Sequence, residues 1–179
     1  MQLFQLDLDI GKSVQAYYDI HINKTIVELT QCIAAACIRQ GITPPNKKNG
    51  QPYKGSHLNH PLVNWILDSG YNPMTVLSYI GYLNSEYKYR FYKEKDHACI
   101  TSLLEWVGNY NFTMLSDSID DTEPATELYP GCPPWNGHAA ADVTDEQIIE
   151  GYRQYYMTEK KHLCKYTRRQ MPEWMKEEK

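Results

Sequence analysis

The chain has 179 residues, which is enough for one domain with a real core, because a domain of about 150 residues buries roughly 70% of its unfolded surface. Its formal net charge of −4 argues against a generally basic coat for nucleic acid. The sequence contains no signal peptide, no apolar run near about 18 residues and an odd number of cysteines, so we expect a cytoplasmic protein with no membrane partner.

The N-terminal part of the chain predicts a short extended segment followed by two helices. Residues 2–10 alternate loosely between apolar and polar types, and Ser13 is a suitable cap for a short helix that reaches about Asp19. The main helix is predicted from Asp19 or Ile20 to Gln40. Gly41 follows it at the position where a helix commonly ends on a glycine.

The middle of the chain predicts a basic loop and three more helices. Residues 42–56 form a hydrophilic Pro/Lys/Asn/Gly loop. Pro61 suits the first turn of a short apolar helix that ends at Gly70. A long tyrosine-rich helical segment covers residues 72–97, and a further apolar piece covers residues 100–107.

The last third predicts an irregular segment and a C-terminal helix. Residues 108–143 combine prolines, glycines and an acidic cluster, which is typical of a long irregular segment. Thr144 and Gln147 form a capping box that starts a helix to about Tyr166, and Trp174 is expected to dock onto the body of the protein. The sequence as a whole therefore predicts an all-α fold, a compact single-domain helical bundle over residues 1–179.

A polar stripe interrupts the main helix. Steps of three, four and three residues place His21, Lys24, Glu28 and Gln31 on one helical face. A cation, a carboxylate, an imidazole and an amide in a row suit acid/base chemistry or phosphate binding. The alternative interpretation is a solvated face with an ordinary Lys24–Glu28 pair.

A second stripe lies in the 72–97 segment. Glu86, Arg90, Lys93 and His97 follow each other by steps of four, three and four residues, with Tyr82 beside them. Two such helices predict a cleft between facing polar rows. In that case Arg90 and Lys93 would bind phosphates and Tyr82 would stack on a base.

The loop before Pro61 carries a third group of polar side chains. Pro61 keeps His60 extended, so His57, Asn59 and His60 are expected at a helix N-terminus, which attracts anions. Either they bind phosphate, or the histidines cap the helix by bonding to its backbone. Binding of a metal through His57 and His60 is a further option, but we expect neither metal nor cofactor.

Two compositional features bear on the ligand. Basic residues concentrate in the 42–56 loop, in 88–95 and in 160–169, which permits phosphate binding despite the negative total charge. The chain has 15 tyrosines against 3 phenylalanines. This surplus fits either surfaces that stack on bases or tyrosines at the edges of the core.

Several motifs resemble a group of small phage-encoded proteins. They are Asp19-x-His21-x-x-Lys24-x-x-x-Glu28-x-x-Gln31, His57-x-Asn59-His60-Pro61-x-x-x-Trp65, Glu86-Tyr87-x-x-Arg90, Tyr152-Arg153-x-Tyr155-Tyr156 and Pro172-x-Trp174. A fainter resemblance, carried by His21, Glu28 and Asn59-His60-Pro61, is to pyrimidine-dimer DNA glycosylases of the endonuclease V kind. That family is all-helical and attacks the sugar C1′ with the N-terminal amine of the chain.

The resemblance implies a role for each of the candidate residues. Glu28 would be the acid/base, and His21, Lys24, His57 and His60 would hold the DNA backbone. From the residues themselves, Lys24 would act as an electrostatic group or as an amine nucleophile, which requires burial.

Three functions follow as hypotheses. The first is a phage-type DNA-acting enzyme, most like a base-excision glycosylase, with catalytic residues Glu28, Lys24 and His21 and with DNA as its partner. The second is a phage anti-defence protein that binds or hydrolyses a small or cyclic nucleotide. The third is a non-enzymatic protein-interaction factor, with tyrosines at the interface and a possible homo-oligomer.

Overall fold

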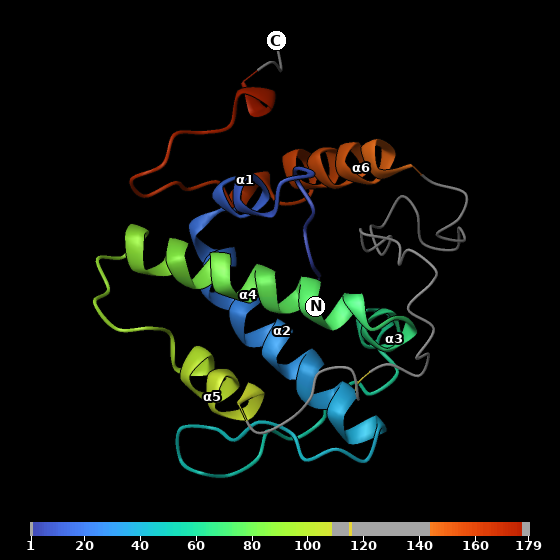
Figure 1. Ribbon diagram of the computed structural model, residues 1–179. Coiled ribbons are helices and arrows are strands. Elements are labelled where there is room, and N and C mark those ends of the chain that lie inside the picture. The colour runs from blue at the N-terminus through green and yellow to red at the C-terminus, as the bar shows by residue number, and fades with distance from the viewer. Residues whose placement is uncertain (1, 109–114, 116–143, 177–179) are drawn as a thin grey trace.

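Two long helices, α2 (Asp19–Arg39) and α4 (Tyr71–Arg90), pack against each other at the centre of the molecule (Figure 1). The apolar side chains that share a face of α2 at helical spacing are fully buried: Ile22, Ile26, Leu29 and Ile33. Burying one such side chain contributes about 1.5–3 kcal/mol. The predicted apolar face of the main helix is therefore confirmed.

The computed structural model describes residues 2–108, 115 and 144–176. Within these ranges the chain forms six α-helices and no β-strand, which confirms the predicted all-α fold. The predicted irregular segment 108–143 lies outside the described residues except at positions 108 and 115. None of the described helices has both the length and the apolar composition needed to cross a membrane.

The first helix, α1 (Ile10–Gln15), is capped by Asp9 and not by Ser13 as predicted. The Asp9 carboxylate accepts a hydrogen bond from the backbone N–H of Lys12 at 2.8 Å. Ser13 lies inside the helix, where its hydroxyl accepts from the Leu6 N–H at 2.9 Å. The prediction was wrong because the Ser13 hydroxyl is hydrogen-bonded to the chain segment before α1 and holds that segment against the helix.

The predicted boundaries around the basic loop are largely confirmed. Helix α2 ends at Arg39, and Gly41 has φ +67°, the left-handed conformation that favours glycine. Helix α3 (Pro61–Asp68) starts at the predicted proline. It ends two residues before the predicted Gly70, because Ser69 is already extended.

Helices α5 (Ala98–Val107) and α6 (Asp145–Thr158) complete the set. Both halves of the predicted capping box of Thr144 and Gln147 are present at the start of α6. Helix α6 packs across the end of the molecule where α1 lies (Figure 1).

Helix α6 ends at Thr158, eight residues before the predicted Tyr166. The chain turns back after α6 through two short 3₁₀ turns, η4 (Lys161–Leu163) and η5 (Glu173–Met175). In this segment the Tyr166 hydroxyl donates to the Ala16 carbonyl at 2.8 Å, a tertiary contact that helical periodicity does not contain. Trp174 docks as predicted, with the Arg153 guanidinium 5.2 Å from the centre of its ring.

A third of the 15 tyrosines belong to the core. Five tyrosines in the described ranges are at most 1% exposed: Tyr17, Tyr18, Tyr79, Tyr152 and Tyr156. The Tyr17 hydroxyl donates to the Phe4 carbonyl at 2.6 Å, and the Tyr18 hydroxyl donates to the Tyr156 carbonyl at 3.1 Å. These residues combine an apolar ring with a satisfied hydroxyl, as buried tyrosines require.

Candidate functional site

The centre of the candidate site is the carboxylate of Glu28 on α2. Its side chain is 21% exposed, and its Oε1 lies 3.7 Å from the Nζ of Lys24, whose side chain is 60% exposed. The two side chains are one helical turn apart, as their spacing predicts. Glu28 is thus shielded on part of its surface, reachable from solvent, and next to a cation.

The loop before α3 lies over the continuation of this face. A Cβ atom built on Gly55 would lie 3.7 Å from the Cα of Ala35, which shows that the loop backbone runs close against α2. Ala35 lies on the same helical face as Glu28, about 10 Å further along the axis. The face of α2 that carries Lys24 and Glu28 therefore continues to the loop that contains His57 and His60.

His60 lies at the junction of this loop with α3 and caps the helix. Its Nδ1 accepts the backbone N–H of Leu62 at 3.1 Å, so a neutral ring carries its proton on Nε2. Burial lowers the pKa of His60, the nearby His57 lowers it further, and the Glu28 carboxylate acts in the opposite direction. His60 is therefore neutral at pH 7, and the Glu28 carboxylate is one of the charges that act on it.

His57 and Asn59 are exposed, with His57 in a left-handed turn. Its φ is +57°, and its carbonyl accepts the His60 N–H at 2.8 Å. A residue other than glycine is uncommon in this conformation, which costs roughly 1–2 kcal/mol. The capping interpretation is confirmed for His60, while His57 and Asn59 are exposed and phosphate binding by them stays a prediction.

His21 belongs to the core, not to the accessible row. It is 4% exposed, and its Nδ1 is hydrogen-bonded to the Tyr156 hydroxyl at 2.6 Å, an oxygen that also accepts the Tyr18 N–H. Burial, followed by the positive charges of Lys24 and Lys160, lowers the pKa of His21 to about 4. His21 was predicted to be a catalytic residue. This prediction is corrected, because α6 covers the His21 ring and keeps it from a substrate.

The burial of His21 predicts a loss of stability in weakly acidic solution. The unfolded chain protonates this histidine near pH 6.5, while the folded chain does so only near pH 4. The unfolded state thus binds more protons in this range, so the free energy of unfolding falls as the pH is lowered from 6.5 to 4. Replacing His21 by glutamine, whose amide can still hydrogen-bond to Tyr156, is expected to flatten this slope.

Urea unfolding at several pH values measures the slope directly. Some slope remains in His21→Gln, because burial also lowers the pKa of His60 and His97. His162, an exposed histidine, provides the matched control, and His162→Gln should leave the slope as in the wild type. An identical slope in His21→Gln and wild type would contradict a neutral buried His21.

The second predicted row does not face the first one. Glu86 and Arg90 are 5% and 0% exposed, respectively, and the Arg90 Nε donates to Glu86 at 2.8 Å. The other Arg90 nitrogens donate to the carbonyls of Gln15 and Tyr17 and to the Asp19 carboxylate. The predicted role of Arg90 as a phosphate ligand was wrong, because its guanidinium is buried and donates its hydrogen bonds to protein groups.

The remaining members of that row also lie elsewhere. Helix α4 ends at Arg90, so Lys93 and His97 fall in the connection to α5 and share no helical face with it. The His97 Nε2 pairs with the Asn23 side chain at 3.0 Å. Tyr82 lies against Gly11 of α1, where a Cβ atom would come 3.2 Å from its ring. The predicted cleft between two polar rows is therefore absent among these residues.

The buried pair of Glu86 and Arg90 instead holds the C-terminal segment. Arg169 donates to both carboxylate oxygens of Glu86, and Thr167 donates to Asp19 through its backbone N–H at 3.0 Å and its hydroxyl at 2.6 Å. Hydrogen bonds from Thr167 and Arg90 lower the pKa of Asp19 against the opposing effect of burial. The basic composition of residues 160–169 was visible in the sequence, but it did not indicate that Glu86 would be the partner of Arg169.

The part of the predicted row that stays accessible is the carboxylate of Glu28 with the ammonium of Lys24 beside it. Glu28 can accept or return a proton, and Lys24 adds a positive charge that attracts an anionic substrate. In the described ranges, no three side chains of His, Cys, Asp or Glu are grouped so that they could hold a metal ion.

The functional assignment rests on this chemistry. No protein-family model, curated protein or solved structure matches the chain.

Proposed function

We propose that this protein is an enzyme that acts on DNA and removes a base, as a base-excision DNA glycosylase does, with Glu28 as its acid/base. The observation that carries the proposal is the position of Glu28. Its side chain is 21% exposed, its carboxylate lies 3.7 Å from the Lys24 ammonium, and it lies on the face of α2 that continues to the loop before α3. A group that moves protons must reach the substrate and keep a defined environment, and Glu28 meets both conditions.

Lys24 fits the electrostatic role better than the nucleophilic one. A lysine becomes a nucleophile when burial disfavours its ammonium form, but the Lys24 side chain is 60% exposed. The amine nucleophile implied by the resemblance belongs to residue 1, which lies outside the described residues. Whichever amine is the nucleophile, it adds to the sugar C1′ while the N-glycosidic bond to the base breaks. The departing base gains a proton, and Glu28 helps to move that proton.

The surroundings of Glu28 suit a polymer better than a small molecule. The exposed basic and polar groups on this part of α2 and on the following loop include Lys24, Lys48, Lys54, His57 and Asn59. Exposed cations, imidazoles and amides at intervals contact successive phosphates and fix the register of a strand. A base extruded from the stack would then reach the row on α2.

The test is a base-release assay on duplexes that each carry one lesion. Duplexes with a pyrimidine dimer, an oxidised base, a deaminated base or an abasic site are incubated with protein, and released bases are identified by mass spectrometry. We expect release from at least one damaged duplex and none from the intact one. Borohydride added during turnover traps a covalent protein–DNA product if an amine attacks C1′.

The same assay contains the results that contradict the proposal. Absence of base release and of trapped product on every duplex would reject a glycosylase. Hydrolysis of a cyclic dinucleotide by the same preparation would assign Glu28 to a nucleotide phosphodiesterase instead. Binding without turnover of any of these substrates would identify a binding protein.

A further inference from the structure

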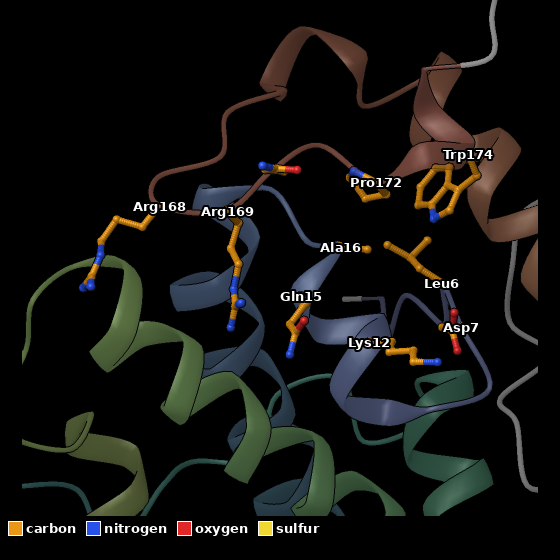
Figure 2. A pocket seen from close by; sticks show the side chains of 10 residues that line it. Leu6, Asp7, Lys12, Gln15, Ala16, Arg168, Arg169, Pro172 and Trp174 are labelled. Atoms are coloured by element: carbon orange, nitrogen blue, oxygen red, sulfur yellow. The ribbon is translucent and has the colours of Figure 1, made fainter.

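A second polar site lies at the other end of the molecule, between α1 and the segment 168–174. It is a cavity of about 460 Å³ that opens to solvent, a size within the usual range of about 300–1,000 Å³ for small-molecule sites. Figure 2 shows Pro172 and Trp174 on one side of the cavity, Gln15 and Lys12 on the opposite side, and Arg169 toward one end.

The lining of this cavity is positively charged. It includes Lys12, Arg168 and Arg169 against a single carboxylate, that of Asp7. The Asp7 carboxylate is already neutralised by the Arg153 guanidinium at 3.5 Å. The Arg169 charge is likewise compensated by the buried Glu86 carboxylate, so the net excess of positive charge in the lining comes from Lys12 and Arg168.

The two arginines are held in place by contacts outside the cavity. Arg169 is fixed by the buried carboxylate of Glu86, and the Arg168 guanidinium lies 4.2 Å from the ring centres of both Tyr89 and Tyr92. Groups that are fixed in advance lose little conformational freedom when they bind. This part of the lining is therefore preorganised.

Other polar groups of the lining remain available to a ligand. Within the described chain, the Lys12 ammonium has no ion-pair partner, and the side-chain amides of Gln15 and Gln170 make no hydrogen bond to protein. These three groups provide one cation and two amides for hydrogen bonds with an anionic ligand.

The opposite wall of the cavity is apolar and aromatic. Pro172, Trp174 and Leu6 contribute to it, and the Trp174 ring is fixed from outside by Arg153 at 5.2 Å. A flat ring can pack on such a wall, since every nucleic-acid base has a π-face that can stack on an aromatic side chain. The cavity thus combines a surface for a flat ring with groups for an anion.

We propose that this cavity binds a nucleotide, with the base against Pro172 and Trp174 and the phosphate near Lys12 and Arg169. The site goes beyond the proposed function, because it does not include Glu28. Figure 1 shows α1 and the C-terminal segment at one end of α2, while the loop before α3 lies toward the other end. The ligand is either a free nucleotide or the phosphorylated end of a strand.

Calorimetric titration of the full-length protein tests the proposal. The probes are the four ribonucleoside 5′-monophosphates, the matching nucleosides, inorganic phosphate and a short oligonucleotide with a 5′-phosphate. We expect at least one nucleotide to bind at least tenfold more tightly than both its nucleoside and inorganic phosphate. Lys12→Glu should weaken this binding at least tenfold, whereas Lys95→Glu, the same charge change at an exposed position outside the cavity, should not.

A second readout locates the ligand by fluorescence. A base stacked on Trp174 changes the tryptophan emission of the protein, and Trp174→Phe should abolish that change while leaving measurable binding. Tighter binding of the 5′-phosphorylated strand than of the mononucleotide, weakened equally by Lys12→Glu, supports the cavity and identifies a strand end as its ligand.

Three results would overturn the proposal. One is nucleotide affinity that is the same in Lys12→Glu and wild type. Another is a loss of affinity in Lys24→Glu alone, which would place the nucleotide at Glu28. The third is affinity for inorganic phosphate equal to that for nucleotides, which would leave an anion site without a place for the base. Failure of base release leaves both the calorimetric and the fluorescence readout unaffected, so the two proposals fail separately.

Discussion

Replacement of Arg90 by methionine is expected to lower the free energy of unfolding by about 3–5 kcal/mol, the usual cost of removing one partner from a buried ion pair. Arg90 is 0% exposed and joins Glu86 of α4 to Asp19 at the start of α2. Its removal leaves both carboxylates without their buried cation. It also leaves the carbonyls of Gln15 and Tyr17 without their donor.

Urea unfolding and thermal unfolding of the variant measure this loss. At this chain length about 1 kcal/mol corresponds to roughly 2–4 °C in the unfolding midpoint, so we expect a fall of roughly 6–20 °C. Lys88→Met is the matched control on the same helix. Lys88 pairs with Asp96 at 2.9 Å, but the two side chains are 39% and 41% exposed.

An exposed pair of this kind contributes about 0–1 kcal/mol, so the control should change stability little. If Arg90→Met cost no more than Lys88→Met, the buried network would not be what joins the C-terminal segment to α2 and α4. A large loss in Arg90→Met alone would establish its structural role and would confirm that this conspicuous cation is not a ligand for phosphate.

Replacement of Glu28 by glutamine is expected to reduce the rate of base release by about 10²–10⁴, the usual contribution of a general acid/base. The amide keeps the shape of the side chain but cannot take or return the proton. Folding should be little affected, because the Lys24–Glu28 contact is an (i, i+4) pair at 3.7 Å with one exposed partner. Such pairs contribute about 0.3–0.5 kcal/mol.

Single-turnover rates and DNA affinity, measured on the same preparation, separate chemistry from binding. We expect the rate to fall while the affinity stays within a few-fold of the wild type. Glu150→Gln, which changes an exposed carboxylate on α6, is the matched control and should turn over like the wild type. Unchanged turnover in Glu28→Gln would remove Glu28 from the mechanism.

Much of the fold was predictable because local rules act over a few residues. Apolar periodicity located α2, and Gly41 marks its end with φ +67°. Pro61 fixes the start of α3, with His60 as the cap. The reciprocal bonds of Thr144 and Gln147 fix the start of α6. Each of these features depends on backbone geometry within one turn of helix.

The errors came from polar residues that helical spacing alone placed on open faces. Spacing correctly put His21 in line with Lys24 and Glu28, but it contains no information about the neighbour that covers each part of the face. Tyr156, 135 residues further along the chain, covers His21. Arg169, 83 residues from Glu86, completes the buried ion network.

The sequence by itself therefore determined the helical class, most helix boundaries and the pairing of Lys24 with Glu28, since these follow from short-range geometry. Only the tertiary structure decided that Arg90 and His21 are core residues, that Glu28 keeps a reachable carboxylate, and that a cationic cavity forms beside α1. The physical reason is burial. A polar side chain becomes a structural partner or an available group according to which distant segment packs over it, and that packing is set by the fold as a whole.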